Sequence, residues 1–178
     1  MCWSKIVDFF RKPKKASLDL LHPEESMNPL ATAESVDLNV VLDKWFSDWV
    51  VPEADRAFWK SWPIFLVPGL TYNGSAYPAL TWPDRTDLDP RWANPGVIAH
   101  ECCHVVWARL DDTARAAFSA EYQSLMLTNA LLQLMRSQKL YVQTQFGKNS
   151  DIEGHAECYR YLGTQMPESL LVYYKGLI

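Results

Sequence analysis

The chain has 178 residues, of which 48% are hydrophobic and 13% aromatic, so we expect a folded protein with a substantial core. Its net charge of −4 gives no electrostatic reason to expect nucleic acid as the main partner. The four cysteines are too few and too irregularly spaced for a disulfide framework, and no apolar run approaches the ~20 residues that span a bilayer. We therefore expect a cytoplasmic protein.

Residues 1–32 are expected to form an amphipathic helix and a connector, outside a single domain of residues 33–178. The apolar positions at helical spacing are Trp3, Ile6, Val7 and Phe10, and a basic cluster and three prolines follow them. Asp8 interrupts the apolar stretch, so it does not fit a signal peptide. The helix could dock on a membrane surface or a partner, or it could pack on its own domain.

Two helices are expected between Ser35 and Trp62. Ser35 can cap the first, whose apolar stripe consists of Leu38, Leu42, Trp45 and Trp49. The second runs from Glu53 to about Trp62, and Pro63 ends it. Aromatic stripes of this kind predict core positions.

A small antiparallel sheet is expected after these helices. Ile64–Val67 is a short apolar segment of β-forming residues, Asn73-Gly74 is a strong turn signal, and Tyr77–Trp82 can be the return strand. The segment from Pro83 to Pro90 is expected to be a solvated loop. Its aspartates could bind calcium, but their spacing matches no EF-hand loop.

The stretch His100-Glu101-Cys102-Cys103-His104 follows a helix start at Asn94 and lies in an apolar run. In a helix, His100 and His104 lie one turn apart on one face, where two uncharged imidazoles can bind one metal ion. Glu101 lies beside that face, where a carboxylate can take a proton from a water on the metal. The alternative is a core helix with hydrogen-bonded histidines, and the pattern favours the metal site. Cys103, three residues after His100, could also approach the metal, but we expect it to be a small core residue.

The C-terminal half is expected to contain a long helix from about Ala114 to Ser137, capped by the preceding aspartates, and then a loop or short strand. A further helical segment, Asp151–Leu162, carries Glu153, His155 and Glu157. At ~100° per residue, the two glutamates share a helix face and His155 points away from it.

Two interpretations of these glutamates follow. One glutamate can bind the metal while the other holds a ligand histidine by a hydrogen bond. Alternatively, Ser150 and Glu153 form a capping box and Glu157 is solvated. The upstream histidine pair favours the first interpretation.

The pattern H-E-x-x-H, followed some fifty residues later by a helix of the form E-x-x-A-E, resembles gluzincin-type zinc metallopeptidases. It is similar to the catalytic domain of anthrax lethal factor and to the small minigluzincins. The resemblance implies a zincin-like core in a mainly helical α+β fold, with Zn²⁺ bound by His100, His104 and Glu153. It also implies Glu101 as general base and acid, and an upstream edge strand that holds a peptide or protein substrate. If Glu153 binds the metal, the shared helix face leaves Glu157 as the outer carboxylate.

The sequence departs from this family at one position. The family commonly has a tyrosine upstream of the third-ligand helix to stabilise the oxyanion, and the matching residue here is Phe146. Loss of one oxyanion donor typically costs ~10²–10³ in rate. Tyr141, Tyr161 or His155 could take its place.

The sequence therefore supports two possible functions. The first is a zinc-dependent metallopeptidase, which intact Glu101 favours because a structural site needs no base. The second is a non-catalytic zinc-containing structural or interaction module of a larger assembly, such as a virus particle, which Phe146 favours.

Overall fold

The computed structural model describes residues 36–138 and 151–174 of the chain. Over these ranges the protein is mainly helical with two small sheets, which confirms the expected α+β class. The expected N-terminal helix and connector lie outside the described residues, as do Tyr141, Phe146 and Ser150. The division into residues 1–32 and 33–178 stays a prediction. In the described part of the chain, no helix is long and apolar enough to cross a membrane.

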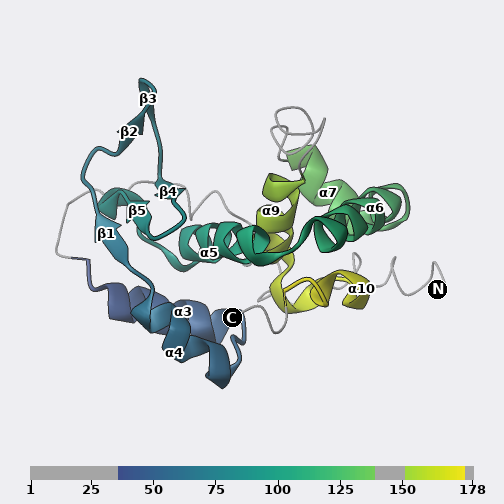
Figure 1. Ribbon diagram of the computed structural model, residues 1–178, viewed down its shortest axis with the longest axis horizontal. Coiled ribbons are helices and arrows are strands. Elements are labelled where there is room, and N and C mark those ends of the chain that lie inside the picture. Colours follow the sequence, from purple (N-terminus) through teal and green to yellow (C-terminus); the bar gives the residue numbers. More distant parts are fainter. Residues whose placement is uncertain (1–35, 139–150, 175–178) are drawn as a thin grey trace.

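Helix α5, Pro95–Arg109, lies across the middle of the molecule, with the strands toward one end and helices α6 and α7 toward the other (Figure 1). It begins where the sequence predicts, because the Asn94 side chain accepts a hydrogen bond from the Val97 backbone N–H at 3.0 Å. Most of its residues are buried, and it packs most extensively against α9, Ile152–Leu162. The helix that carries the histidine pair is therefore the centre of the fold.

Two hydrophobic cores lie on either side of α5. The first joins Val97, Ile98 and Val105 of α5 to the sheet and to α3, Leu38–Asp48, and α4, Glu53–Ser61. The second joins Cys103 and Trp107 of α5 to the C-terminal helices; its other buried members are Leu110, Phe118, Tyr122, Met126, Leu132, Met135, Ala156, Cys158, Tyr161, Leu162, Met166, Leu170 and Tyr174. Burial of these aliphatic and aromatic side chains is the main favourable term that holds α5 in place.

Helix α3 begins at Leu38 with Asp37 as its N-cap residue, where the sequence predicted Ser35. The Asp37 carboxylate accepts a hydrogen bond from the Asn39 backbone N–H at 2.9 Å. Aspartate caps helices as well as serine does, so the pattern alone did not separate the two positions. Helix α4 matches its prediction and ends just before Trp62 and Pro63.

The main sheet has three strands in the order β1-β5-β4: β1 is Ile64–Leu66, β4 is Ala79–Thr81 and β5 is Thr86–Leu88. Strand β4 runs antiparallel to β5, but β1 pairs with β5 in parallel, so the predicted purely antiparallel sheet is wrong. The central strand β5 lies in the segment that was predicted to be a loop. The strand was missed because its sequence is acidic and bounded by prolines, and because β5 is stabilised by pairing with β4 and β1 rather than by a run of β-forming residues of its own.

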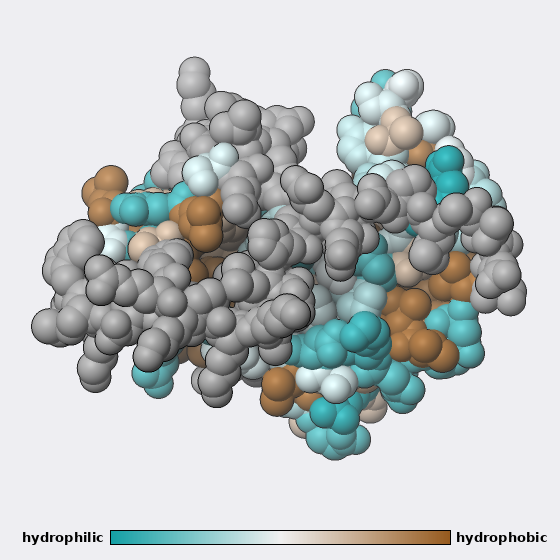
Figure 2. All heavy atoms as spheres, turned by 180° about the vertical axis from the view of Figure 1, so that it is seen from behind, coloured by the Kyte–Doolittle hydropathy of each residue, from teal (hydrophilic) through white to brown (hydrophobic). Residues whose placement is uncertain are grey.

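The Asn73-Gly74 turn signal is confirmed, but it joins a different pair of strands. It connects β2, Thr71–Tyr72, to β3, Ser75–Ala76, in a separate antiparallel hairpin. Both turn residues have positive φ, 49° and 79°, as a type I′ turn requires. The hairpin projects from the body of the protein, as Figure 2 shows at its upper right from the opposite side.

The aspartates after β4 are not simply solvated, in contrast to the prediction. Asp89 is 0% exposed, pairs with Arg91, and accepts a hydrogen bond from the Gly69 backbone N–H at 3.1 Å. It also caps the short helix η2, Pro90–Trp92. Asp87 accepts hydrogen bonds from Arg85 at 3.0 Å and from the Trp82 indole at 2.7 Å. These carboxylates hold the segment between the sheet and α5 in a fixed path.

The long helix predicted over residues 114–137 is two helices, α6, Asp112–Thr128, and α7, Ala130–Gln138. Asn129 separates them with an extended backbone, φ −101° and ψ 115°. Its side chain accepts hydrogen bonds from the Leu131 and Leu132 backbone N–H groups at 3.0 and 3.2 Å, which starts α7 anew. The short elements η3, Gly163–Gln165, and α10, Glu168–Leu171, then close the second core.

Candidate metal centre

Helix α5 presents His100 and His104 on one face, one turn apart, as the sequence predicts. Their Nε2 atoms lie 3.1 Å from each other, and both side chains are largely buried. Neither imidazole lies on an open surface, so a ligand that reaches both nitrogens must enter from the cleft between α5 and the neighbouring elements.

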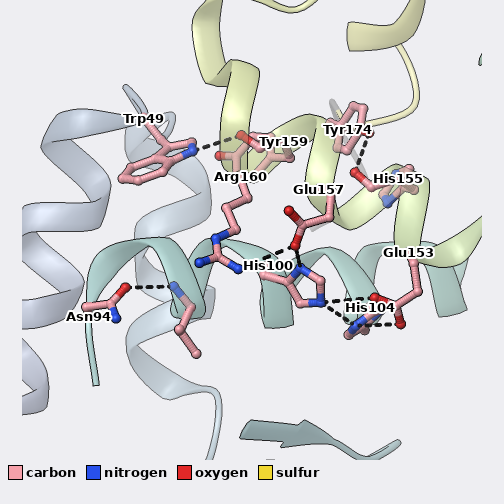
Figure 3. Close-up of polar contacts among 11 residues, drawn as sticks. Trp49, Asn94, His100, His104, Glu153, His155, Glu157, Tyr159, Arg160 and Tyr174 are labelled. Atoms are coloured by element: carbon pink, nitrogen blue, oxygen red, sulfur yellow. Dashed lines mark hydrogen bonds and ion pairs between the residues drawn. The ribbon is translucent and has the colours of Figure 1, made fainter. Parts of the chain in front are cut away.

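Helix α9 brings Glu153 to the same point, although 49 positions of sequence separate it from His104. Its Oε2 lies 3.3 Å from Nε2 of His100, and its Oε1 lies 3.7 Å from Nε2 of His104 (Figure 3). Zinc bonds of ~2.0–2.1 Å in tetrahedral geometry separate neighbouring ligand atoms by roughly 3.3–3.4 Å. The three side chains therefore form a donor set of the right type and spacing to hold a metal ion.

Gly154 allows α9 to lie as close to α6 as it does. A Cβ atom at this position would lie 2.8 Å from the Tyr122 ring, which is closer than real Cβ atoms approach a ring. The glycine next to Glu153 is therefore a requirement of packing. It fixes the position from which Glu153 reaches the histidines.

Glu157 lies one turn further along α9 and is 0% exposed. Its Oε1 lies 2.7 Å from Nδ1 of His100, so Nδ1–H of the imidazole donates to it (Figure 3). When His100 is neutral, this hydrogen bond fixes the tautomer that leaves Nε2 with a lone pair toward Glu153 and His104. The interpretation of Glu157 as a solvated residue is wrong, because the side chain is enclosed between α9 and α5.

Arg160 belongs to the same cluster, and sequence reasoning missed it. Its guanidinium lies 3.4 Å from Oε1 of Glu157, and the side chain lines the cavity beside the histidines. The spacing of three residues after Glu157 places both on one helix face, which was the available signal. Arg160 adds a cation behind the carboxylate that holds His100.

The charges of the cluster shift the pKa values of its members in opposite directions. Burial lowers the pKa of His100, but its hydrogen bonds to Glu153 and Glu157 outweigh burial and raise that pKa to about 10. Burial and the neighbouring His100 lower the pKa of His104. Burial raises the pKa of Glu153, but the hydrogen bond to His100 and the charges of His100 and His104 together outweigh burial and lower that pKa overall. The two carboxylates thus favour a positive charge at the point where they meet the histidines.

Glu101 lies beside the histidine pair and is 8% exposed. Its Oε2 accepts a hydrogen bond from the Thr81 hydroxyl of β4 at 2.7 Å. The carboxylate also lines the cavity that the two histidines and Glu153 line. A group bound to the three candidate ligands would therefore share a space with the carboxylate of Glu101.

This cavity has a volume of about 830 Å³, and strand β4 and the residues around it form one wall. The wall consists of Tyr77, Pro78, Ala79, Leu80, Thr81, Trp82 and Pro83. Strand β4 is the last strand of the three-stranded sheet on this side, so its outer edge faces away from β5. An edge strand therefore lies beside the polar cluster.

The other predicted candidates lie elsewhere. His155 lies in the second core, where its ring stacks on Tyr174 with ring centroids 4.1 Å apart. Tyr161 is also buried in that core, and Cys103 packs there as the sequence predicted. None of these three residues lines the cavity that contains Glu101. Neither His155 nor Tyr161 therefore lies where the oxyanion role that we considered for it would require.

No protein-family model matches the chain, and no curated protein or solved structure matches it.

Proposed function

We propose that the protein is a zinc-dependent metallopeptidase. The observation that carries this proposal is the convergence of His100, His104 and Glu153 at distances that suit tetrahedral zinc, with Glu101 in the same cavity. Three protein ligands leave a fourth position for water or substrate, which is the pattern of catalytic zinc sites. Structural zinc sites are instead closed by four protein ligands.

Each residue of the cluster has a separate role in this proposal. Bound zinc would polarise the scissile carbonyl and acidify a water molecule. Glu101 accepts the proton of that water while the water oxygen bonds to the carbonyl carbon, and it then donates the proton to the departing amine nitrogen. Glu157 holds His100 in the tautomer that presents Nε2, and Arg160 supports Glu157 through their contact at 3.4 Å.

The proposed substrate is an extended peptide that lies along β4. The outer edge of this strand offers backbone donors and acceptors, and a peptide can add to such an edge as a further strand. The cavity of about 830 Å³ has the aromatic side chains of Trp62, Tyr77 and Trp82 in its lining. These rings can contact substrate side chains, while the edge of β4 holds the substrate backbone.

A non-catalytic zinc module is the second candidate, and Phe146 is the observation that favours it. A phenylalanine supplies no oxyanion donor where the resembling family commonly has tyrosine. The burial of Glu101 in the cavity lining favours the enzyme, because a site with no chemistry to perform has no use for a carboxylate held there.

Metal analysis and a peptidase assay on full-length protein test the proposal together. We expect one zinc per chain, and a His100→Ala, His104→Ala variant should retain none. Glu101→Gln should keep the zinc and the fold but abolish cleavage of a quenched fluorescent peptide library, because it removes the base and no ligand. Glu168→Gln, at an exposed position of α10, serves as the matched control and should cleave at the wild-type rate.

A metal-free wild-type preparation after zinc loading would contradict the metal site. A variant Glu101→Gln that cleaves as fast as the wild type would contradict the role of the base. One zinc per chain without any cleavage would support the second candidate instead.

A further inference from the structure

The Thr81 hydroxyl contacts the side chain of Glu101 from the neighbouring strand β4. Thr81 Oγ1 lies 2.7 Å from Oε2 of Glu101 and 3.3 Å from the Glu101 backbone oxygen. It also lies 3.1 Å from Oγ1 of Thr86, whose own Oγ1 accepts a hydrogen bond from the Trp62 indole at 3.1 Å. Four residues are therefore linked in a row by hydrogen bonds.

The number of hydrogens that each group carries determines which group donates in each of these hydrogen bonds. The indole N–H of Trp62 can only donate, and an ionised carboxylate can only accept. Thr81 has one hydroxyl hydrogen, and the nearest acceptor for it is Oε2 of Glu101. Thr81 must therefore accept from Thr86, which in turn accepts from Trp62. All three donors point the same way, toward Glu101.

The row follows the order of the sheet. Trp62 lies just before β1, Thr86 is on the central strand β5, and Thr81 is its direct partner on β4. The pairing of β1, β5 and β4 thus aligns the three donors, Trp62, Thr86 and Thr81. The last of them donates to Glu101 on α5. Thr86 is buried, so water does not compete freely for its hydroxyl.

We infer that Thr81 is a positioning residue for Glu101, and that Thr86 and Trp62 fix the direction in which Thr81 donates. This inference rests on the proposed function for its catalytic consequence. Thr81 occupies one carboxylate oxygen, Oε2, and leaves Oε1 as the oxygen that accepts the proton of the attacking water. Without the hydroxyl, the carboxylate can rotate about its last torsion, and an error of about 1 Å in such a group can cost ~10²-fold in rate.

The test compares three variants of the zinc-loaded full-length protein. Thr81→Val keeps the shape and the strand preference but removes the hydroxyl, and we expect kcat to fall roughly 10- to 100-fold. KM and zinc content should stay within about twofold of wild type. The Thr81 hydroxyl points to Glu101, so it binds neither a metal ligand nor the backbone groups that the edge of β4 would offer to a peptide. Thr81→Ser retains the hydroxyl and should restore most of kcat.

The remaining links should give graded effects. Thr86→Val removes the donor to Thr81 and should lower kcat less than Thr81→Val does, and Trp62→Phe, which removes only the indole N–H, should lower it least. An equal loss in Thr81→Ser and Thr81→Val would show that the methyl packing matters rather than the hydrogen bond. That result, or the reverse order of effects along the row, would overturn the inference.

A second measurement needs no catalysis. Urea unfolding of Thr81→Val, Glu101→Ala and the double variant gives their coupling, which for a hydrogen bond to a charged group should be roughly tenfold or more in the unfolding equilibrium constant. Additive effects would overturn the inference. If the wild-type protein lacks peptidase activity, the proposed function fails, and this cycle still decides whether Thr81 holds Glu101.

Discussion

The two faces of α9 place histidines in opposite environments. On one face, Glu153 and Glu157 lie against His100 of α5; on the other, His155 is enclosed by aromatic rings. Burial lowers the pKa of both histidines. At His100 the two carboxylates outweigh burial and raise the pKa to about 10, whereas the pKa of His155 falls to about 3.

This difference shows that burial alone does not set the pKa of a histidine. His155 is as enclosed as any residue of the core, and its ring packs on Tyr174 and Phe118 like another aromatic side chain. His100 differs because carboxylates meet both of its nitrogens. The presence of acceptors on the facing helix decides which histidine can bind a cation.

The largest expected effect comes from Glu153, the carboxylate that closes the donor set. Glu153→Ala removes a ligand, so zinc affinity should fall by more than the roughly 10- to 100-fold that loss of an outer hydrogen-bond partner costs. A competition titration against a chromophoric chelator measures this change.

Glu157→Ala provides the comparison on the same helix face. It should weaken zinc binding by about 10- to 100-fold, because His100 loses the acceptor that fixes its tautomer. Glu157→Gln keeps an acceptor and should weaken binding less. If Glu157→Ala loses more zinc than Glu153→Ala, the roles of the two glutamates are exchanged.

On the other face of α9, His155→Phe should leave zinc content unchanged and alter only the response to acid. The pKa of His155 in the folded protein, about 3, lies below the ordinary value of 6.5. Between these two pH values the unfolded chain binds a proton at His155 and the folded chain does not. The wild type should therefore lose stability from this group as pH falls from about 6.5 toward 3. Thermal unfolding at pH 7.5 and at pH 4.5 measures the loss, which should be smaller in His155→Phe. Equal losses in both proteins would contradict the neutral state of the buried ring.

The smallest effect is expected from removal of the N-terminal segment. Removal of residues 1–15 should leave the thermal unfolding temperature and the zinc content close to wild type, because Pro13 and the basic residues separate this segment from the patterned domain. A large loss of thermal stability would place Trp3 and Phe10 in the core instead.

Local signals predicted α5 and the ligand face of α9 well. Asn94 marks the start of α5, and helical spacing alone places His100 beside His104 and Glu153 beside Glu157. The interpretation of His155 as a residue that faces away also followed from that spacing. These features depend on residues within one or two turns of each other.

The missed features depend on strand pairing, on a helix cap inside an apolar pattern, and on a contact between the sheet and α5. The short segment Thr86–Leu88 carries no sequence signal for its pairing with β1 and β4. The apolar pattern continues across Asn129, so the end of α6 was hidden. The contact of Thr81 with Glu101 could not be predicted either, because it requires the correct sheet and its distance from α5.

The contact between Arg160 and Glu157 also sets the electrical balance of the enclosed site. Glu101, Glu153 and Glu157 carry three negative charges when ionised, and Arg160 carries one positive charge, with both ligand histidines neutral. Enclosed charges are costly unless they are compensated. Two negative charges remain, and a divalent cation cancels them, whereas a monovalent or trivalent ion leaves the site charged. If the proposed function holds, Arg160, which lies outside the donor set, would therefore favour a divalent ion at this site.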